Sequence, residues 1–299
     1  MAGRLLSPEL VERLGRVEMR ARGIVEGFLS GLHKSPYRGF SVEFAEHRGY
    51  VPGDDVRHVD WKVYGKRERY YIKQYHEETN FAVTLLLDTS ASMQFGSAGA
   101  TKLEYAALLA AALAYVVLRQ NDAVAFGAYD RKAAAYLPPG TRLPFLAKLA
   151  EALQRVPTDG TTDTRKSLAQ LARCMARKGI AVVLSDFLDD ADAVLAGLGE
   201  LRARGHDVIA VQVLDAAELE FGLKGHVRFK GIEKALDAFV EPQRLRAAYL
   251  EALEAHLRAL RQGAGRAGID YRLVATSEPP EEFLRTYLAA RGKVRRVAR

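Results

Sequence analysis

The sequence is poor in cysteine and has no long apolar run, and both shortages exclude classes of protein. Its single cysteine, Cys174, excludes an internal disulfide and a cysteine-based zinc site. Because Cys174 falls in a helical pattern, we expect it to be a small buried core residue. The longest apolar run, residues 105–118, is shorter than the roughly 20 residues that a membrane-spanning helix needs.

A histidine metal centre and a secretory leader are also missing from the pattern. The seven histidines are scattered, with no HxxxH or HxH spacing. The first residues lack the apolar core of a signal peptide, so we expect a cytoplasmic protein. The net charge is +7, and much of the excess lies in a basic tail at residues 291–299. We expect that tail to be solvated, with contact to acidic lipid or nucleic acid as the alternative.

What the sequence does contain is an alternation of strand and helix patterns. Residues 82–87 and 180–185 are short apolar runs that end in polar residues, as buried strands of a parallel sheet do. Residues 132–137 follow a strand at 123–129 too closely for a crossover, so this pair predicts a hairpin with an antiparallel edge strand. We therefore predict an α/β fold with a mostly parallel, doubly wound sheet over residues 81–290.

Outside that sheet the patterns are more varied. We expect an N-terminal helix over residues 8–29, because its apolar residues form one stripe. The remainder of an N-terminal region, residues 1–80, holds short strand-like pieces that we expect to dock on the sheet domain. Residues 216–242 are interpreted as irregular, apart from an extended piece at 227–229. Glycines at 263–268 follow a helix and precede a strand, which indicates a turn and not a dinucleotide-binding loop.

Oxygen-bearing side chains follow the two buried strands. Asp88 ends the first strand, with Ser90 and Ser92 at alternate positions after it, and Asp186 ends the second. Thr162 lies just before a helical pattern and offers a further hydroxyl. The carboxyl ends of strands meet at the crevice of an open α/β sheet, so we expect these groups to gather around one divalent cation, Mg²⁺ or Mn²⁺. The alternative is that Asp88 caps the following turn while the serines satisfy backbone donors.

Two other functions stay open at this point. A metal-dependent phosphohydrolase of the haloacid dehalogenase type places an aspartate nucleophile after its first strand, but it needs a second aspartate where Ser90 stands. The second open function is that of a nucleic-acid-binding accessory protein, because basic and aromatic residues interleave over residues 47–75. Acidic residues in the same stretch offer internal partners, so aromatic packing is the simpler interpretation.

The spacing of the oxygen-bearing residues resembles a known metal site. Asp88-x-Ser90-x-Ser92, Gly160-x-Thr162 and Ser185-Asp186 look like the metal-ion-dependent adhesion site of the von Willebrand factor type A domain. The resemblance implies that the two serines ligate directly, the two aspartates act mainly through water, and Thr162 does either. Such an ion takes a carboxylate from a protein partner, which is binding chemistry and not turnover.

A second resemblance begins upstream of the metal-site motif. Together the two resemblances cover nearly the whole chain. The segments 39–44, 48–57 and 60–61 are similar to the signature of the family called domain of unknown function 58. It implies a non-catalytic adaptor that works with a MoxR-type AAA+ ATPase in the assembly or maturation of other proteins. Many members carry N-terminal membrane helices, and this sequence has none. The role of Gly53-Asp54-Asp55 and Asp60-Trp61 stays open.

Overall fold

We analysed a computed structural model of the chain. The structure describes residues 41–50, 63–65, 70–78, 82–97, 99–130, 134–155, 163–175, 178–222, 227–230, 237–240 and 242–297. The expected N-terminal helix at 8–29, the turn around Gly53 and the metal-site residue Thr162 lie outside these ranges.

The described residues fall into two compact units, one between His33 and Phe81 and the other from Ala82 onward. In the first unit, β1 (Ser41–Gly49) and β2 (Tyr71–Glu78) form an antiparallel pair with an irregular register between Phe44 and Glu46. Tyr64 stacks on Tyr70 at a ring-centroid distance of 4.5 Å, and Tyr50 lies 6.2 Å from Tyr70. Three of the interleaved aromatic residues therefore pack against one another.

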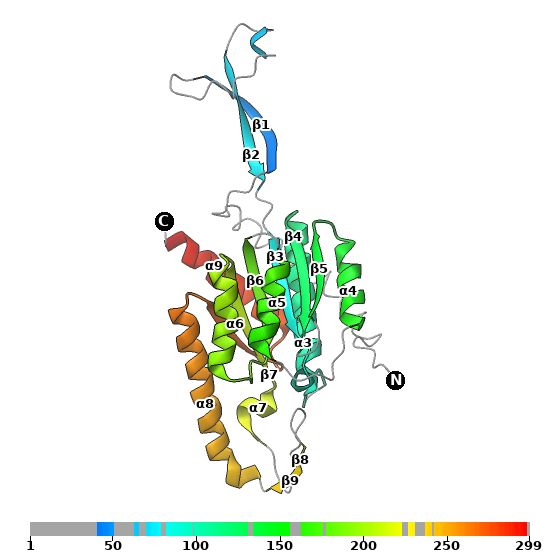
Figure 1. Cartoon of the computed structure of the whole chain (residues 1–299), viewed down its shortest axis with the longest axis vertical. Helices are drawn as coiled ribbons and strands as arrows, with labels where there is room; N and C mark the ends of the chain where they lie inside the picture. The colour runs from blue at the N-terminus through cyan, green and yellow to red at the C-terminus, as the bar shows by residue number, and fades with distance from the viewer. Residues whose placement is uncertain are drawn as a thin grey trace. The chain divides into compact units, whose positions relative to one another are not determined.

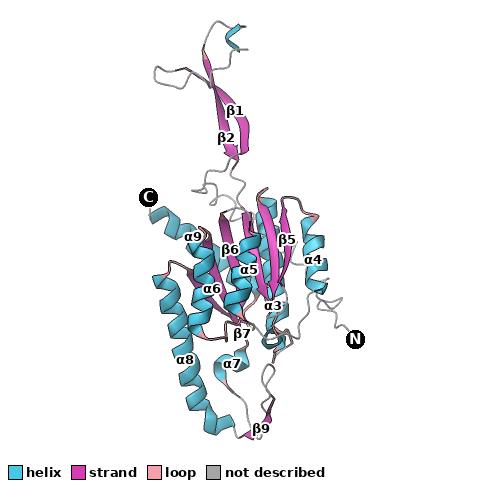
Figure 2. Cartoon of the chain, in the orientation of Figure 1, coloured by secondary structure: helices cyan, strands magenta, loops and turns pink. Residues whose placement is uncertain are grey.

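The second unit is built on a six-stranded sheet, five strands of which are parallel (Figures 1 and 2). The antiparallel strand lies at one edge, as predicted, and carries two consecutive prolines, Pro138 and Pro139. In spatial order the strands are β10 (Asp270–Ala275), β7 (Asp207–Leu214), β6 (Gly179–Ser185), β3 (Ala82–Asp88), β4 (Ala123–Tyr129) and β5 (Ala134–Gly140).

The chain starts this sheet in its middle and winds outward in both directions. It passes from β3 to β4 and β5 on one side, then returns to β6, β7 and β10 on the other. All seven residues of β3 are buried, as its apolar run predicts. The strand order therefore reverses between β3 and β6, and the two strands that end in Asp88 and before Asp186 are neighbours, as predicted.

Helices cover both faces of the sheet (Figure 2). One face carries a core cluster to which three helices contribute, including Leu168, Leu198 and Leu260. Because the two faces are both covered, the central strands are mostly apolar. The helices on that face are α5 (Thr164–Cys174), α6 (Ala191–Ala203) and α8 (Pro242–Arg266); those on the other are α3 (Lys102–Arg119), α4 (Phe145–Arg155) and α9 (Pro280–Val297).

Several expectations about the remaining elements were wrong. The extended piece expected at 227–229 is confirmed as strand β8 (Val227–Lys230), but the described residues of 216–242 are otherwise not irregular. They also hold helix α7 (Ala216–Glu220) and strand β9 (Asp237–Val240), which pairs with β8. Cys174 is exposed at the end of its helix and is not a core residue. The basic residues after 290 begin inside α9, which continues to Val297.

Among the residues that the structure describes, no helix is both long enough and apolar enough to cross a membrane.

Candidate metal site at the sheet crevice

Asp88 joins the ends of the two central strands. Its Oδ2 accepts a hydrogen bond from the Ser185 hydroxyl at 2.6 Å, and its Oδ1 accepts one from the Ser90 amide at 2.9 Å. The Ser185 hydroxyl oxygen in turn accepts from the amide of Phe187 at 2.9 Å. The Asp88 carboxylate is therefore fixed in place by its own loop and by the neighbouring strand.

The environment of Asp88 disfavours its negative charge. The residue is 1% exposed. Burial, together with the nearby charge of Asp186, raises the pKa of Asp88 to about 7, against the opposing effect of the hydrogen bonds from Ser185 and Ser90. A divalent cation bound beside this carboxylate would stabilise its charged form. The uncompensated negative charge at Asp88 therefore favours cation binding.

The two serines lie in and beside a short turn that follows β3. Ser90 precedes the 3-10 helix η3 (Ala91–Gln94) and Ser92 lies within it. Their hydroxyl oxygens are 3.1 Å apart. Neighbouring oxygens around an octahedral Mg²⁺ lie about 2.9 Å apart, because each is about 2.1 Å from the ion. The donor chemistry and the spacing of the two serines thus fit a divalent cation.

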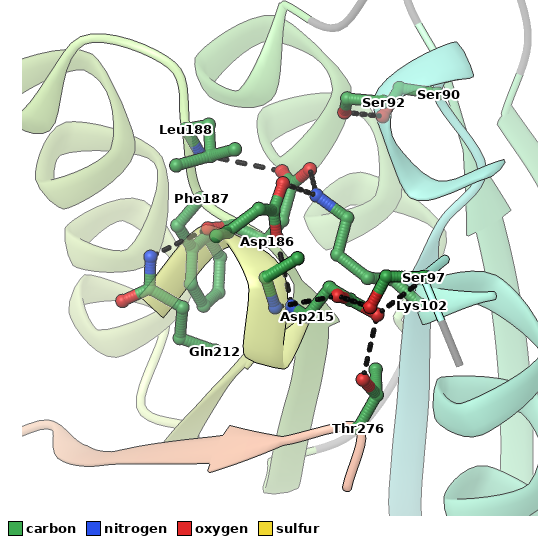
Figure 3. A network of polar contacts seen from close by, with 12 residues as sticks. Ser90, Ser92, Ser97, Lys102, Asp186, Phe187, Leu188, Gln212, Asp215 and Thr276 are labelled. Carbon is green, nitrogen blue, oxygen red and sulfur yellow. Dashed lines mark hydrogen bonds and ion pairs between the residues drawn. The ribbon is translucent and has the colours of Figure 1, made fainter. Parts of the chain in front are cut away.

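Asp186 is held by a buried lysine that the sequence analysis did not identify (Figure 3). Lys102 Nζ lies 2.8 Å from Asp186 Oδ2 and 2.7 Å from Glu218 Oε1. The other Asp186 oxygen accepts a hydrogen bond from the Leu188 amide at 3.3 Å. Figure 3 shows the Lys102 ammonium pointing toward the Asp186 carboxylate.

The position of Lys102 follows from local features of the chain. Thr101 caps helix α3 in a capping box with Glu104, which makes Lys102 the first helical residue. Its side chain is 1% exposed, and its Nζ lies 5.9 Å from the centre of the Phe95 ring. Burial alone would lower the pKa of Lys102, but the charges of Asp186 and Glu218 outweigh burial and raise it. The lysine is therefore charged.

Asp215, at the end of β7, organises the loops beside this cluster. Its side chain accepts hydrogen bonds from the Ser97 amide and hydroxyl, from the Ala217 amide at 2.8 Å and from the Thr276 hydroxyl at 3.0 Å. Burial raises the pKa of Asp215, but these hydrogen bonds outweigh it and leave the pKa lowered. Asp215 thus ties the loop after η3 to α7 and to the end of β10.

The start of α5 approaches the same crevice. The Thr164 amide donates to Asp189 in the loop after β6 at 3.4 Å, and the Ser167 hydroxyl donates to the carbonyl of Asp130 after β4 at 2.8 Å. Since β3 lies between β6 and β4, these bonds place the first turn of α5 over the end of β3. The Thr164 hydroxyl is buried, and no hydrogen-bond partner for it occurs among the described residues.

The structure thus brings four of the predicted ligands to one edge of the sheet, while the fifth, Thr162, lies outside the described residues. Asp190 caps α6 through the amides of Asp192 and Ala193. Among the described residues, no group of three or more histidine, cysteine, aspartate or glutamate side chains is placed to hold a metal. A site here would therefore depend on hydroxyl ligands.

Comparison with curated proteins finds relatives that span most of the chain. The uncharacterized protein Rv1480 of Mycobacterium tuberculosis (strain ATCC 25618 / H37Rv) is 28% identical over 267 residues, which is 86% of this chain and 81% of that protein. The uncharacterized protein Mb1516 of Mycobacterium bovis (strain ATCC BAA-935 / AF2122/97) matches with the same identity and coverage.

Solved structures with a similar fold include two bacterial proteins and one domain described as VWA. Conserved hypothetical protein BatB from Bacteroides thetaiotaomicron has a TM-score of 0.46 at 13% identity, over 71% of this chain and 99% of that one. An aerotolerance-related membrane protein from Bacteroides fragilis NCTC 9343 has a TM-score of 0.45 at 15% identity, over 70% and 99%. The SpRpn10 VWA domain has a TM-score of 0.40 at 12% identity, over 68% and 93%.

The family assignment rests on a match to a described protein family. The family described as "Protein of unknown function DUF58" matches residues 46–259, which is more than half of the chain. That range runs from the end of β1, through the whole crevice, into α8. This chain belongs to the DUF58 family.

Proposed function

We propose that this protein is a non-catalytic, divalent-metal-dependent protein-interaction module. The observation that carries the proposal is the crevice between β3 and β6, where the paired Ser90 and Ser92 hydroxyls share one sheet edge with two buried carboxylates. Bound there, Mg²⁺ or Mn²⁺ would supply an electrophilic centre for an oxygen ligand from a partner.

Each residue has a distinct part in this proposal. Ser90 and Ser92 provide the direct ligands, because their hydroxyls already lie at the spacing of neighbouring metal ligands. Asp88, whose two oxygens accept hydrogen bonds from Ser185 and Ser90, would act mainly through bound water from a fixed position. Asp186, which is paired with Lys102, would likewise act through water. We assign Thr162 as a further ligand by its place in the sequence motif.

The partner in this proposal is a protein that presents an acidic side chain. Ligands that are mostly neutral leave a bound cation with an unsatisfied positive charge, so a carboxylate is the favoured incoming group. A MoxR-type AAA+ ATPase is the candidate partner that the family resemblance suggests. The module would then serve as its adaptor in the assembly or maturation of other proteins.

A binding role is favoured over hydrolysis by the identity of Ser90, two positions after Asp88. A serine hydroxyl at position 90 cannot act as the general acid that a dehalogenase-type phosphatase needs there, because its pKa is far from neutral. Hydrolysis of p-nitrophenyl phosphate that requires Asp88 would contradict the proposal.

The decisive experiment measures Mn²⁺ binding by calorimetry in the wild type and in the double variant Ser90→Ala/Ser92→Ala. We expect the wild type to bind one equivalent and the double variant to lose binding at least tenfold, with unchanged circular dichroism. Ser277→Ala, which alters an exposed serine in the turn after β10, is the matched control and should bind as the wild type does. Equal affinity in the double variant would remove the site.

A pull-down tests the partner. Purified MoxR-type ATPase from the same organism should be retained by the immobilised protein in Mg²⁺ and released by a chelator. Retention that survives both the chelator and the double variant would show that any contact between the two proteins does not use this site.

A further inference from the structure

Lys102 is a buried charge that contacts the candidate metal site without belonging to it. Its ammonium group pairs with Asp186 at 2.8 Å and with Glu218 at 2.7 Å, and its side chain is 1% exposed. It reaches the crevice from α3, whereas Asp186 follows β6 and Glu218 lies in α7. One side chain therefore joins three elements at the carboxyl edge of the sheet.

Stability alone is a poor reason for this arrangement. Removing an ammonium and two carboxylates from water is costly, and well-packed apolar side chains of similar size often stabilise a core as well or better. Here the carboxylates are also held by other bonds, since Glu218 accepts from the Asp215 amide at 2.8 Å and Asp186 from the Leu188 amide. The cluster thus calls for an explanation in terms of the site that it borders.

The charges in the crevice suggest such an explanation. Asp88, Asp186 and Glu218 are three buried or half-buried carboxylates, and Lys102 supplies one positive charge among them. Without that charge, a divalent cation held near Asp88 would lie close to an additional uncompensated carboxylate. The protein would then bind the cation more tightly, but the bound cation would attract an anion from a partner more weakly.

We propose, on the basis of the function proposed above, that Lys102 is a positioning residue that keeps the metal site able to attract a carboxylate from the partner. It fixes Asp186 through one oxygen and neutralises its charge. The cation at Ser90 and Ser92 therefore retains the positive charge that an incoming acidic side chain needs. Lys102 thus strengthens the binding of the partner's carboxylate and weakens the binding of the metal.

The test compares two affinities in one set of variants: that of Mn²⁺ for the protein by calorimetry, and that of acetate for the Mn²⁺-loaded protein by water proton relaxation. In Lys102→Met we expect Mn²⁺ to bind roughly tenfold more tightly and acetate roughly tenfold more weakly. A lysine that only supports the fold would weaken both affinities when it is lost. The opposite signs are therefore the signature of the proposed role.

Charge-matched variants keep the test informative if Lys102→Met does not fold. Glu218→Gln retains the size of the side chain and removes one negative charge, so it should shift both affinities in the directions opposite to Lys102→Met. The double variant Lys102→Met/Glu218→Gln restores the net charge and should return both affinities most of the way to the wild type. Lys148→Met, at an exposed position in α4, is the control and should change neither.

Each outcome of these measurements has a clear meaning. Opposite shifts in the two affinities, reversed by Glu218→Gln, support the proposal. Unchanged affinities, or losses of both in the same direction, overturn it while leaving the metal site intact. A wild-type protein that binds no Mn²⁺ would instead overturn the proposed function, and this result is visible before any variant is made.

Discussion

At the scale of single residues, Asp122 has an unusual environment away from the crevice. It lies in the turn between α3 and β4, where burial raises the pKa of its carboxyl to about 6. The folded protein therefore binds a proton between pH 4 and 6 that the unfolded chain has released, so the free energy of unfolding falls as the pH rises through this range.

The Asp122→Asn variant should remove this pH-dependent fall in the free energy of unfolding. The full shift corresponds to about 3 kcal/mol, and partial contact with solvent reduces the expected gain in the free energy of unfolding to about 1 kcal/mol at pH 7. Urea denaturation at pH 4.5 and pH 7 measures it. A variant that gains as much at pH 4.5 as at pH 7 would show that titration of Asp122 is not the cause.

Gln212 is a second residue with a specific structural part. It is fully buried in β7, where its amide nitrogen donates to the Asp186 carbonyl at 2.6 Å and its amide oxygen accepts from the Tyr271 hydroxyl. Gln212→Leu leaves the Asp186 carbonyl unsatisfied, so we expect the free energy of unfolding to fall by about 2 kcal/mol. Tyr271→Phe, which spares the first bond, should cost about 1 kcal/mol in the same denaturation experiment.

Single residues also mark the limit of what the sequence could predict at the site. Asp88 and Asp186 were identifiable because each follows an apolar run, and parallel strands bring their carboxyl ends to one edge. Lys102 was not identifiable, because its ion pairs join residues that are 84 and 116 positions apart. The only local signal was a lysine at the first position of an otherwise apolar helix.

At the scale of elements, the close contact between β3 and β6 yields a prediction. A Cβ atom added at Gly179 would lie 2.1 Å from the Ala82 carbonyl oxygen on the neighbouring strand, so the backbone would have to move. We expect Gly179→Ala to lower the free energy of unfolding by about 2 kcal/mol in urea denaturation.

Gly199 in α6 provides the matched control for that substitution. A Cβ atom added there meets no atom within 4 Å. Gly199→Ala should therefore raise the free energy of unfolding by about 0.5–1 kcal/mol, through helix propensity alone. Equal effects of the two glycine substitutions would contradict the assigned strand contact.

The elements differ in how well their sequences specify them. The strands expected at 82–87, 123–129, 132–137 and 180–185 each carry a run of six or seven residues suited to a strand, and the structure confirms them with small changes of boundary. Helix α7 and strands β8 and β9 have only four or five residues each, which is too short for a period to emerge. The start of α7 is instead fixed by a local N-cap, Asp215.

At the scale of the whole molecule, a ligand that binds only the folded state raises its stability. If Mn²⁺ binds the crevice, a concentration of about 100 times the Kd should stabilise the fold by about 2.7 kcal/mol. For a domain of this size the Tm should rise by about 5 °C or more, measured by calorimetry. The Ser90→Ala/Ser92→Ala variant should show no rise, and an equal rise in both proteins would place the stabilising ion elsewhere.

The two prolines in β5 have a consequence for how copies of this chain meet one another. β5 lies at one edge of the described sheet, and neither Pro138 nor Pro139 has an amide hydrogen. Because successive amides of a strand point to opposite sides, one of these two prolines removes a donor from the outer side of β5. An extended segment that pairs with β5 would lack one of the backbone hydrogen-bond donors that it needs. This discourages strand-by-strand polymerisation at this edge of the sheet. Copies of this chain are thereby discouraged from pairing with one another along this edge.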